Sequence, residues 1–402
     1  MRPIELQRSS YSTRILANPF AAYTAGFCIA LCVYSLGYSD LYPPLQQSLI
    51  SFLLVTCAVC VLLAITIGDI EDTCAHRHQS VELHLYIAIV LIAVFAAEII
   101  VNRGIPLVLI TTGADFNYQD FGIPVVHVAF VGFCYFYAVY WFDVYLLERR
   151  QLFLALSVSA TSTSLLIFNR GAFMITLLAL VFVYVQRRGI SRRLLQSFAV
   201  IIIGTLWGFG LLGDLRTHGA SGESIILKIG EASDRFVNSD IPTALFWPYL
   251  YVSSPLANLQ LNITDRVAND SPGTYFELEF LPDFVSKRIV SDDTVMSLNP
   301  VLITDELAVS TMYGRSFLLM GWIGLLLSFS YFIVVTVICL KILRGSKYFI
   351  TASGILSSLA FLNIFDNMYI FAGGILQVIV ALFLHLFERR DAMNSSANAI
   401  LP

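Results

Sequence analysis

The sequence predicts an all-α polytopic membrane protein with about ten transmembrane helices, and three observations support this fold class. Only 13% of the 402 residues are charged, against roughly 25% in ordinary soluble domains. Hydrophobic residues make up 57% of the chain, and its mean hydropathy is +0.76. The apolar residues come in blocks of about 20, the length of a helix that crosses a bilayer. These features exclude a soluble enzyme or a nucleic-acid binder, and the net charge of −4 gives no sign of a polyanionic partner.

Ten apolar blocks are interpreted as spans, and together they make residues 1–402 a single integral membrane domain. Their ends are expected to be correct within a few residues, because helix boundaries are the least certain part of such a prediction. The predicted spans are 19–37, 47–68, 83–101, 124–147, 152–168, 171–186, 194–213, 316–340, 349–365 and 370–387.

The positions of Lys and Arg orient these spans, because basic residues in short loops favour the cytoplasmic side. If the N-terminus is cytoplasmic and the spans alternate, the short outer segments hold only Arg103 and Arg170. The long segment 214–315 is then also outside, and long loops translocate largely regardless of their charge. Both termini are therefore expected in the cytoplasm.

The second predicted outer segment, 102–123, is too interrupted to form a span. Pro106 opens a short apolar run, and polar turn residues follow it before Pro124. We expect a re-entrant or interfacial piece that places backbone at membrane depth, which is tolerated where it lines a cavity.

The large outer loop, 214–315, lies between the seventh and eighth spans and contains two patterned segments. Apolar residues recur at helical spacing over 225–237 with the charges mostly on the other side, which predicts an amphipathic surface helix. Segment 241–264 has no charge but contains Pro248 and Pro255. If it crossed, the basic residues after it would move outside. We therefore expect a helix in or just above the outer leaflet, or one that dips in and returns.

A few polar residues in apolar surroundings require an explanation. Glu98 lies near the outer end of the third span, where a carboxylate is costly unless it is paired or faces a cavity. Arg103 is close enough in sequence to be its partner. The two residues form either a structural ion pair or a membrane-edge site with one acid and one base.

Three more outward-facing residues have both a structural and a functional interpretation. Arg170, in Asn169-Arg170-Gly171, either extends to lipid headgroups or binds an anion, and its planar guanidinium suits diphosphate oxygens. Arg315 opens the eighth span and either anchors it or binds an anion. His127 follows the start of the fourth span, where it is either structural or transfers a proton.

The sequence gives no sign of a metal or a cofactor. It contains no G-x-x-x-x-G-K-[ST] motif for nucleotide phosphates, no H-E-x-x-H and no Cys/His cluster. Aromatic residues are frequent in the outer loop. Their faces stack on sugar rings, but they also form ordinary interfacial belts.

Several short motifs follow one another between residues 98 and 324, all on the predicted outer side. They are Glu98 with Asn102-Arg103-Gly104-Ile105-Pro106-Leu107, Phe121-Gly122-Ile123-Pro124 with His127, Asn169-Arg170-Gly171, Trp247-Pro248-Tyr249 with Ser254-Pro255-Leu256-Ala257-Asn258, and Ser310-Thr311 with Tyr313-Gly314, Gly321 and Gly324. In order and sidedness they resemble the bacterial oligosaccharide repeat-unit polymerases, the Wzy-type O-antigen and capsule polymerases. The helix count and the large outer loop before the last three spans also resemble that family.

The resemblance implies a GT-C-like fold in the bacterial inner membrane and a reaction on its periplasmic face. Such enzymes transfer a glycan from an undecaprenyl diphosphate carrier onto a new lipid-linked repeat unit, and undecaprenyl diphosphate leaves. The implied partners are the lipid-linked oligosaccharide donor and acceptor, membrane lipid and a chain-length regulator protein.

The resemblance also implies roles for individual residues. The expected catalytic residues are Glu98 or His127 as the base, with Arg170 stabilising the leaving charge. The expected diphosphate-binding residues are Arg103, Arg170 and Arg315. The expected glycan-binding residues are Tyr251, Asn258 and Tyr275.

Two alternatives stay open at this stage. An O-antigen ligase is a related enzyme that transfers glycan to lipid A-core and is expected to carry a key histidine within its large outer loop, where this chain has only His218. A lipid-linked oligosaccharide flippase or other transporter, which is not an enzyme, is expected to have charges inside the bundle and two similar halves. The sequence shows neither two similar halves nor many charges within its spans.

Overall fold

The structure, a computed structural model, describes residues 15–67, 80–112, 116, 120–190, 196 and 225–398. Within these residues the secondary structure is helical, and the only β interaction is an isolated bridge between Ser39 and Ala232. The all-α membrane class predicted from the sequence is therefore confirmed. The predicted seventh span, 194–213, lies outside the described residues apart from Gln196.

Nine helices in the described part of the chain fall on predicted spans. Six are long and apolar enough to cross a membrane: α3 (Gln47–Ile67), α4 (Val81–Val101), α6 (Val126–Glu148), α8 (Arg170–Arg188), α16 (Gly314–Leu343) and α18 (Ala372–Asn398). Three are apolar but shorter: α2 (Pro19–Tyr34), α7 (Gln151–Leu166) and α17 (Phe349–Leu362). The total of ten spans remains a prediction.

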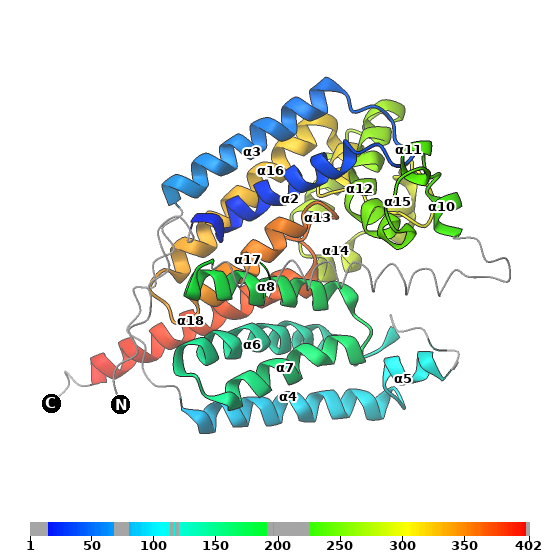
Figure 1. Cartoon of the computed structure of the whole chain (residues 1–402). Helices are drawn as coiled ribbons and strands as arrows, with labels where there is room; N and C mark the ends of the chain where they lie inside the picture. Colours follow the sequence, from blue (N-terminus) through cyan, green and yellow to red (C-terminus); the bar gives the residue numbers. More distant parts are fainter. Residues whose placement is uncertain are drawn as a thin grey trace.

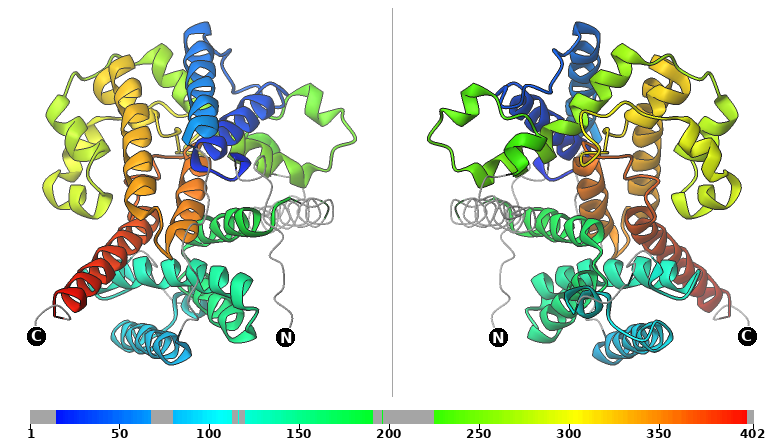
Figure 2. Two further views of the ribbon diagram at one scale, coloured as in Figure 1. Left: turned by 90° about the vertical axis from the view of Figure 1, so that its left-hand side faces the viewer. Right: turned by 90° about the vertical axis from the view of Figure 1, so that its right-hand side faces the viewer.

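The helices form a bundle in which α17 lies at the centre, packed against both α2 and α8 (Figure 1). On one side of α17, α2 packs against α3. On the other, α6 packs against α7, α8 and α18. Figure 2 shows α3 and α4 at opposite edges of the bundle. Few residues of these two edge helices are buried, as expected of helices that face lipid.

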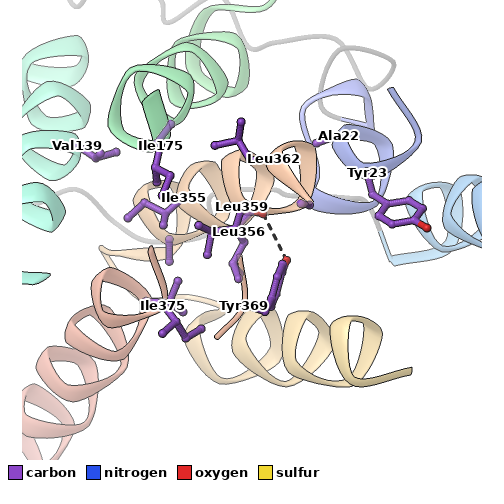
Figure 3. Close-up of a cluster of buried hydrophobic side chains, with 14 of the residues drawn as sticks. Ala22, Tyr23, Val139, Ile175, Ile355, Leu356, Leu359, Leu362, Tyr369 and Ile375 are labelled. Carbon is purple, nitrogen blue, oxygen red and sulfur yellow. Dashed lines mark hydrogen bonds between the residues drawn. The ribbon is translucent and has the colours of Figure 1, made fainter. Parts of the chain in front are cut away.

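The central helix α17 is apolar on every side, and such a helix is normally enclosed by others. Thirteen of its 14 residues are buried. Small residues let its neighbours approach closely: a Cβ added at Gly354 would lie 2.5 Å from Cγ2 of Val183 on α8. Figure 3 shows apolar side chains of α2, α8 and α18 gathered around α17, and the Tyr369 hydroxyl donating to the Leu356 carbonyl at 3.4 Å.

A buried ion pair joins three helices of the bundle. Arg187 of α8 donates through Nε and Nη2 to the two carboxylate oxygens of Asp143 on α6, at 2.5 and 3.0 Å. Thr351 of α17 donates to the same carboxylate at 3.2 Å. The bidentate geometry and the added hydroxyl satisfy a charge that would otherwise be costly to bury. Asp143 is therefore a structural partner inside the bundle.

Short helices gather at one end of the bundle (Figure 1). Residues 225–313 form an outer cap of α10 (Ile225–Ile229), α11 (Asp234–Val237), η2 (Thr243–Leu245), α12 (Phe246–Asp265), α13 (Pro272–Glu279), α14 (Asp283–Ile289) and α15 (Asp292–Ser297). At the same end, α5 (Pro106–Thr111) is the short helix within the predicted re-entrant segment 102–123.

The prediction of one amphipathic surface helix over 225–237 is wrong. The chain breaks between α10 and α11, where Glu231 has a φ of +40° and Ala232 pairs with Ser39. The predicted apolar face is nevertheless correct, since Ile226 and Phe236 are buried against α12 and its neighbours. The helical periodicity therefore identified which side chains turn inward, but not the turn between them.

Segment 241–264 is largely enclosed by protein. It forms α12, of which thirteen of 20 residues are buried, and it packs against α2 and α16. This helix is not among the described helices that are apolar enough to cross a membrane. It is a core element of the outer cap, and its position relative to the outer leaflet remains a prediction.

Helix α16 is interrupted near its N-terminal end at Gly321, whose φ of 56° and ψ of −141° are not helical. The break frees backbone carbonyls, and the outer cap binds them. Asn269 donates its N–H to Leu318 O at 2.9 Å, and Ser271 donates to Leu319 O at 3.1 Å. Glycine suits this position because a side chain would be strained at positive φ.

Replacing Asp143 with Ala should destabilise the bundle strongly, because it leaves the Arg187 guanidinium buried without its counter-ion. We expect a loss of about 3–5 kcal/mol of folding free energy, measured as a large fall in the apparent melting temperature of the detergent-purified protein. The control is Arg150→Ala, which removes an exposed guanidinium from its pair with Glu148 and should cost about 1 kcal/mol or less. Equal melting temperatures for both variants would contradict this account.

Candidate anion-binding and acid–base site

A cavity of about 1210 Å³ opens where the outer cap meets the bundle. Its wall combines residues from α5, the start of α6, the α7–α8 turn, α14 and the α17–α18 turn. Among the charged and ionisable residues in its described wall are Asp120, His127, Arg170 and Lys287. The structure thus brings together two residues that the sequence singled out, His127 and Arg170.

Glu98 is paired with His127. His127 Nδ1 lies 3.0 and 3.1 Å from the two carboxylate oxygens of Glu98, which is fully buried, and the N–H of Ile123 donates to the same carboxylate at 3.5 Å. The prediction that Arg103 is the partner of Glu98 is wrong. The described contacts include no ion pair between them, and Arg103 is exposed beyond the end of α4.

The turn before α6 sets the position of the imidazole. Gly122 has a φ of +110°, and a Cβ added there would lie 2.4 Å from Cγ of His127. Phe121 contacts the imidazole edge-to-face, with 5.7 Å between ring centroids. His127 keeps 23% of its side-chain surface exposed, whereas Glu98 keeps none. The arrangement is a buried carboxylate that orients a partly exposed imidazole toward a cavity.

Arg170 stands at the N-terminus of α8. Phe168 has a φ of +61°, which turns the chain sharply, and the Arg170 guanidinium lies over the Phe168 ring at 4.6 Å. The side chain of Asn169 caps the helix by accepting from the N–H of Ala172 at 3.0 Å. The positive end of the helix dipole and an exposed guanidinium therefore meet at the cavity wall.

Arg315 forms an ion pair with Glu279, away from the cavity. Its Nε donates to Glu279 Oε1 at 2.5 Å, while Ser316 and Asn367 donate to Glu279 Oε2 at 2.9 and 3.1 Å. Glu279 is 1% exposed. Neither Arg315 nor Arg103 is among the described residues of the cavity wall. Of the three arginines expected to bind diphosphate, only Arg170 reaches this cavity.

Two of the expected glycan-binding residues are buried structural groups. Asn258 donates to Leu307 O and Val309 O at 2.6 and 2.8 Å and accepts from Ile303 N at 2.8 Å, which fixes the strand-like segment after α15. These contacts place Asn258 inside the outer cap, and its expected role in glycan binding stays a prediction.

Tyr275 is also buried and hydrogen-bonded inside the protein. Its hydroxyl contacts Gly324 O at 3.0 Å and the Ser328 hydroxyl at 2.8 Å, and burial raises the pKa of Tyr275 to about 12. The expected role of Tyr275 in glycan binding stays a prediction, as does that of Asn258. Tyr251, stacked on Trp247, keeps 37% of its surface exposed and stays a candidate sugar contact.

The sequence did not single out Lys287 or Asp120 at the cavity, or Glu279 in the outer cap. Lys287 lies in a loop with many charges, and nothing in its local pattern separates it from its neighbour Arg288. A charged residue whose role depends on a contact far away in the chain leaves no periodic signal. In the described part of the chain, no group of three or more His, Cys, Asp and Glu residues is placed to hold a metal ion.

The fold and this site together define an all-α membrane protein with a cationic cavity beside a buried carboxylate–histidine pair. Comparisons with protein-family models, curated proteins and solved structures give no match. The function is therefore inferred from the site itself.

Asn258→Ala should loosen the segment 301–309 while the bundle stays folded. The substitution removes hydrogen bonds to three backbone groups and should cost about 1–3 kcal/mol. Limited proteolysis read by mass spectrometry should show faster cleavage within this segment. Gln260→Ala is the matched control, because Gln260 is equally buried on α12 but bonds Gln46 and Thr264 instead. Unchanged cleavage in Asn258→Ala, or equal acceleration in both variants, would contradict the assignment.

Proposed function

We propose that this protein is a glycosyltransferase that polymerises lipid-diphosphate-linked oligosaccharide repeat units. One observation supports this function above the others: a single cavity is lined by Arg170 and by His127, and His127 is held by the buried Glu98. The site therefore offers a cation for a leaving diphosphate and a base for an incoming hydroxyl.

The cationic part of the site suits a diphosphate. A guanidinium donates two parallel hydrogen bonds to phosphate oxygens, and the N-terminus of α8 adds the partial positive charge of its backbone N–H groups. Charge builds up on the diphosphate as its bond to the sugar breaks. Cations fixed in advance at that point lower the barrier, because they need no reorganisation during the reaction.

The carboxylate–histidine pair suits the acceptor. When Nδ1–H donates to Glu98, Nε2 of His127 keeps its lone pair and can accept a proton. The carboxylate also stabilises the imidazolium that forms. This is the arrangement of a general base with an orienting group, and Glu98 acts through His127 rather than on the substrate.

The proposed transfer forms one bond at C1 of the donor sugar and breaks another. A hydroxyl oxygen of the acceptor glycan attacks C1 of the donor sugar, and the hydroxyl proton passes to His127 Nε2. The bond between C1 and the diphosphate oxygen breaks, and its electron pair leaves with the lipid diphosphate, which Arg170 stabilises. The cavity of about 1210 Å³ is wide enough to align two sugar residues and a phosphate group, and such alignment contributes much of the rate enhancement in transfer reactions.

The proposal includes the remaining architecture predicted from the sequence. It places ten spans with a GT-C-like arrangement in a bacterial inner membrane, both termini in the cytoplasm and the outer cap in the periplasm. The substrates are undecaprenyl-diphosphate-linked oligosaccharides, and the product is O-antigen in lipopolysaccharide or a capsular polysaccharide. A chain-length regulator is the proposed protein partner.

Variants of the cavity should separate these roles in a host that lacks the gene. His127→Ala should lower the rate of polymer formation from lipid-linked repeat units roughly 100-fold or more, since a general base contributes about that much. Arg170→Ala should also abolish the polysaccharide ladder on a gel, whereas Arg170→Lys should keep part of it, because lysine retains the charge but not the planar fork.

Arg103→Ala is the control, because Arg103 is an exposed outer arginine that does not contribute to the described cavity wall. It should give a normal ladder. Core lipid carrying one repeat unit is the expected product of the inactive variants. A full ladder from both Arg170→Ala and His127→Ala would show that the proposed function is wrong, and bare core without a repeat unit in the gene deletion would favour a ligase or a flippase.

A further inference from the structure

We propose that Lys287 of the outer cap is the second cation of this site and that it makes the site selective for a diphosphate over a monophosphate. The inference rests on the proposed function, since it assigns a ligand contact within the same cavity. It follows from the position of Lys287, from its electrostatic surroundings and from the geometry of the two anions.

The position of Lys287 is fixed by its own helix. Asp283, the first residue of α14, donates its N–H to Ile370 O at 2.8 Å and accepts the N–H of Ala372 on its side chain at 2.8 Å. These two hydrogen bonds attach α14 to the turn between α17 and α18, where Phe371 also lines the cavity. Lys287 lies one helical turn after Asp283 and so reaches the cavity wall from the outer cap.

The ammonium of Lys287 is available to a ligand. Its side chain is 77% exposed, and its ion pair with Asp283 is long, at 3.7 Å. Asp283 is already engaged by the N–H of Ala372 through its other carboxylate oxygen. An exposed pair of this kind contributes little stability, so a phosphate can replace the carboxylate at small cost.

The described cavity wall offers two cations to an anionic ligand. Arg170 and Lys287 contribute two positive charges, against one negative charge from Asp120. They also come from different parts of the fold, Arg170 from the bundle and Lys287 from the outer cap. A monophosphate can be held by the guanidinium and the helix terminus alone. A diphosphate carries more charge over a greater length, and its second phosphate needs a second cation.

Binding to the full-length protein in detergent tests this inference directly. The probes are farnesyl diphosphate and farnesyl monophosphate, measured by isothermal titration calorimetry at one low ionic strength. Lys287→Ala should weaken diphosphate binding about tenfold, as expected for a lost charged hydrogen bond, and should change monophosphate binding less than twofold. Lys287→Arg should restore most of the diphosphate affinity.

Arg288→Ala is the matched control. Arg288 follows Lys287 on the same helix and is also exposed, but its guanidinium donates to the carbonyl of Phe284 and it is not among the described wall residues. This variant should bind both probes as the unmodified protein does. Melting temperatures of all variants should agree, since both side chains lie on the surface.

The outcomes separate the inference from the proposed function. If Arg170→Ala weakens diphosphate binding and Lys287→Ala does not, the inference is overturned and the proposed function stands. Equal weakening of both probes by Lys287→Ala overturns the selectivity. If the unmodified protein binds neither probe, or if Arg170→Ala changes nothing, the proposed function itself fails. A tenfold loss confined to the diphosphate in Lys287→Ala, with Arg288→Ala unchanged, supports the inference.

Discussion

The buried carboxylate of Glu279 joins the outer cap to the helix bundle, and the cavity depends on this attachment. Glu279 belongs to α13, whereas its donors Arg315, Ser316 and Asn367 belong to α16 and to the turn after α17. A carboxylate that is 1% exposed is tolerated only when its oxygens are satisfied in this way. Because three separate segments meet at one charge, α13 has little freedom to move against the bundle. Helix α14 begins just after α13 and is therefore held where it can complete the cavity wall.

Most of the described bundle was predictable from the sequence, because a helix in lipid must satisfy its backbone internally and must present apolar side chains over about 20 residues. The outer cap was harder to predict. Over 225–237 the helical spacing of Ile226 and Phe236 was correct, yet the chain turns between them at Glu231. The spacing reports burial on one side, and two short helices folded onto α12 can bury the same residues as one long helix. Local periodicity cannot distinguish these two solutions, since the difference is made by contacts with α12.

Local sequence patterns predicted the candidate site only in part, for the same reason. His127 and Arg170 were identifiable because each is an isolated polar residue in an apolar stretch, and both line the cavity. The partner of Glu98 was not identifiable from the sequence, because Arg103 is nearer to it along the chain. The actual contact joins α4 to α6 and is made by His127. The hydrogen bonds that Asn258 makes were not predictable either. A polar side chain in an outer loop suggests a ligand contact, but here it satisfies buried backbone groups, and those groups leave no pattern in the sequence.

The break in α16 at Gly321 determines where this protein can be joined to a related protein in a chimaera. The carbonyls of Leu318 and Leu319 receive their hydrogen bonds from Asn269 and Ser271, far back in the outer cap. In a chimaera whose junction is placed where the predicted eighth span begins, these acceptors would come from one parent and their donors from the other. The outer cap and the first turns of α16 must therefore come from the same parent protein. A recombination boundary that respects the fold lies after the break, within the continuous part of the helix.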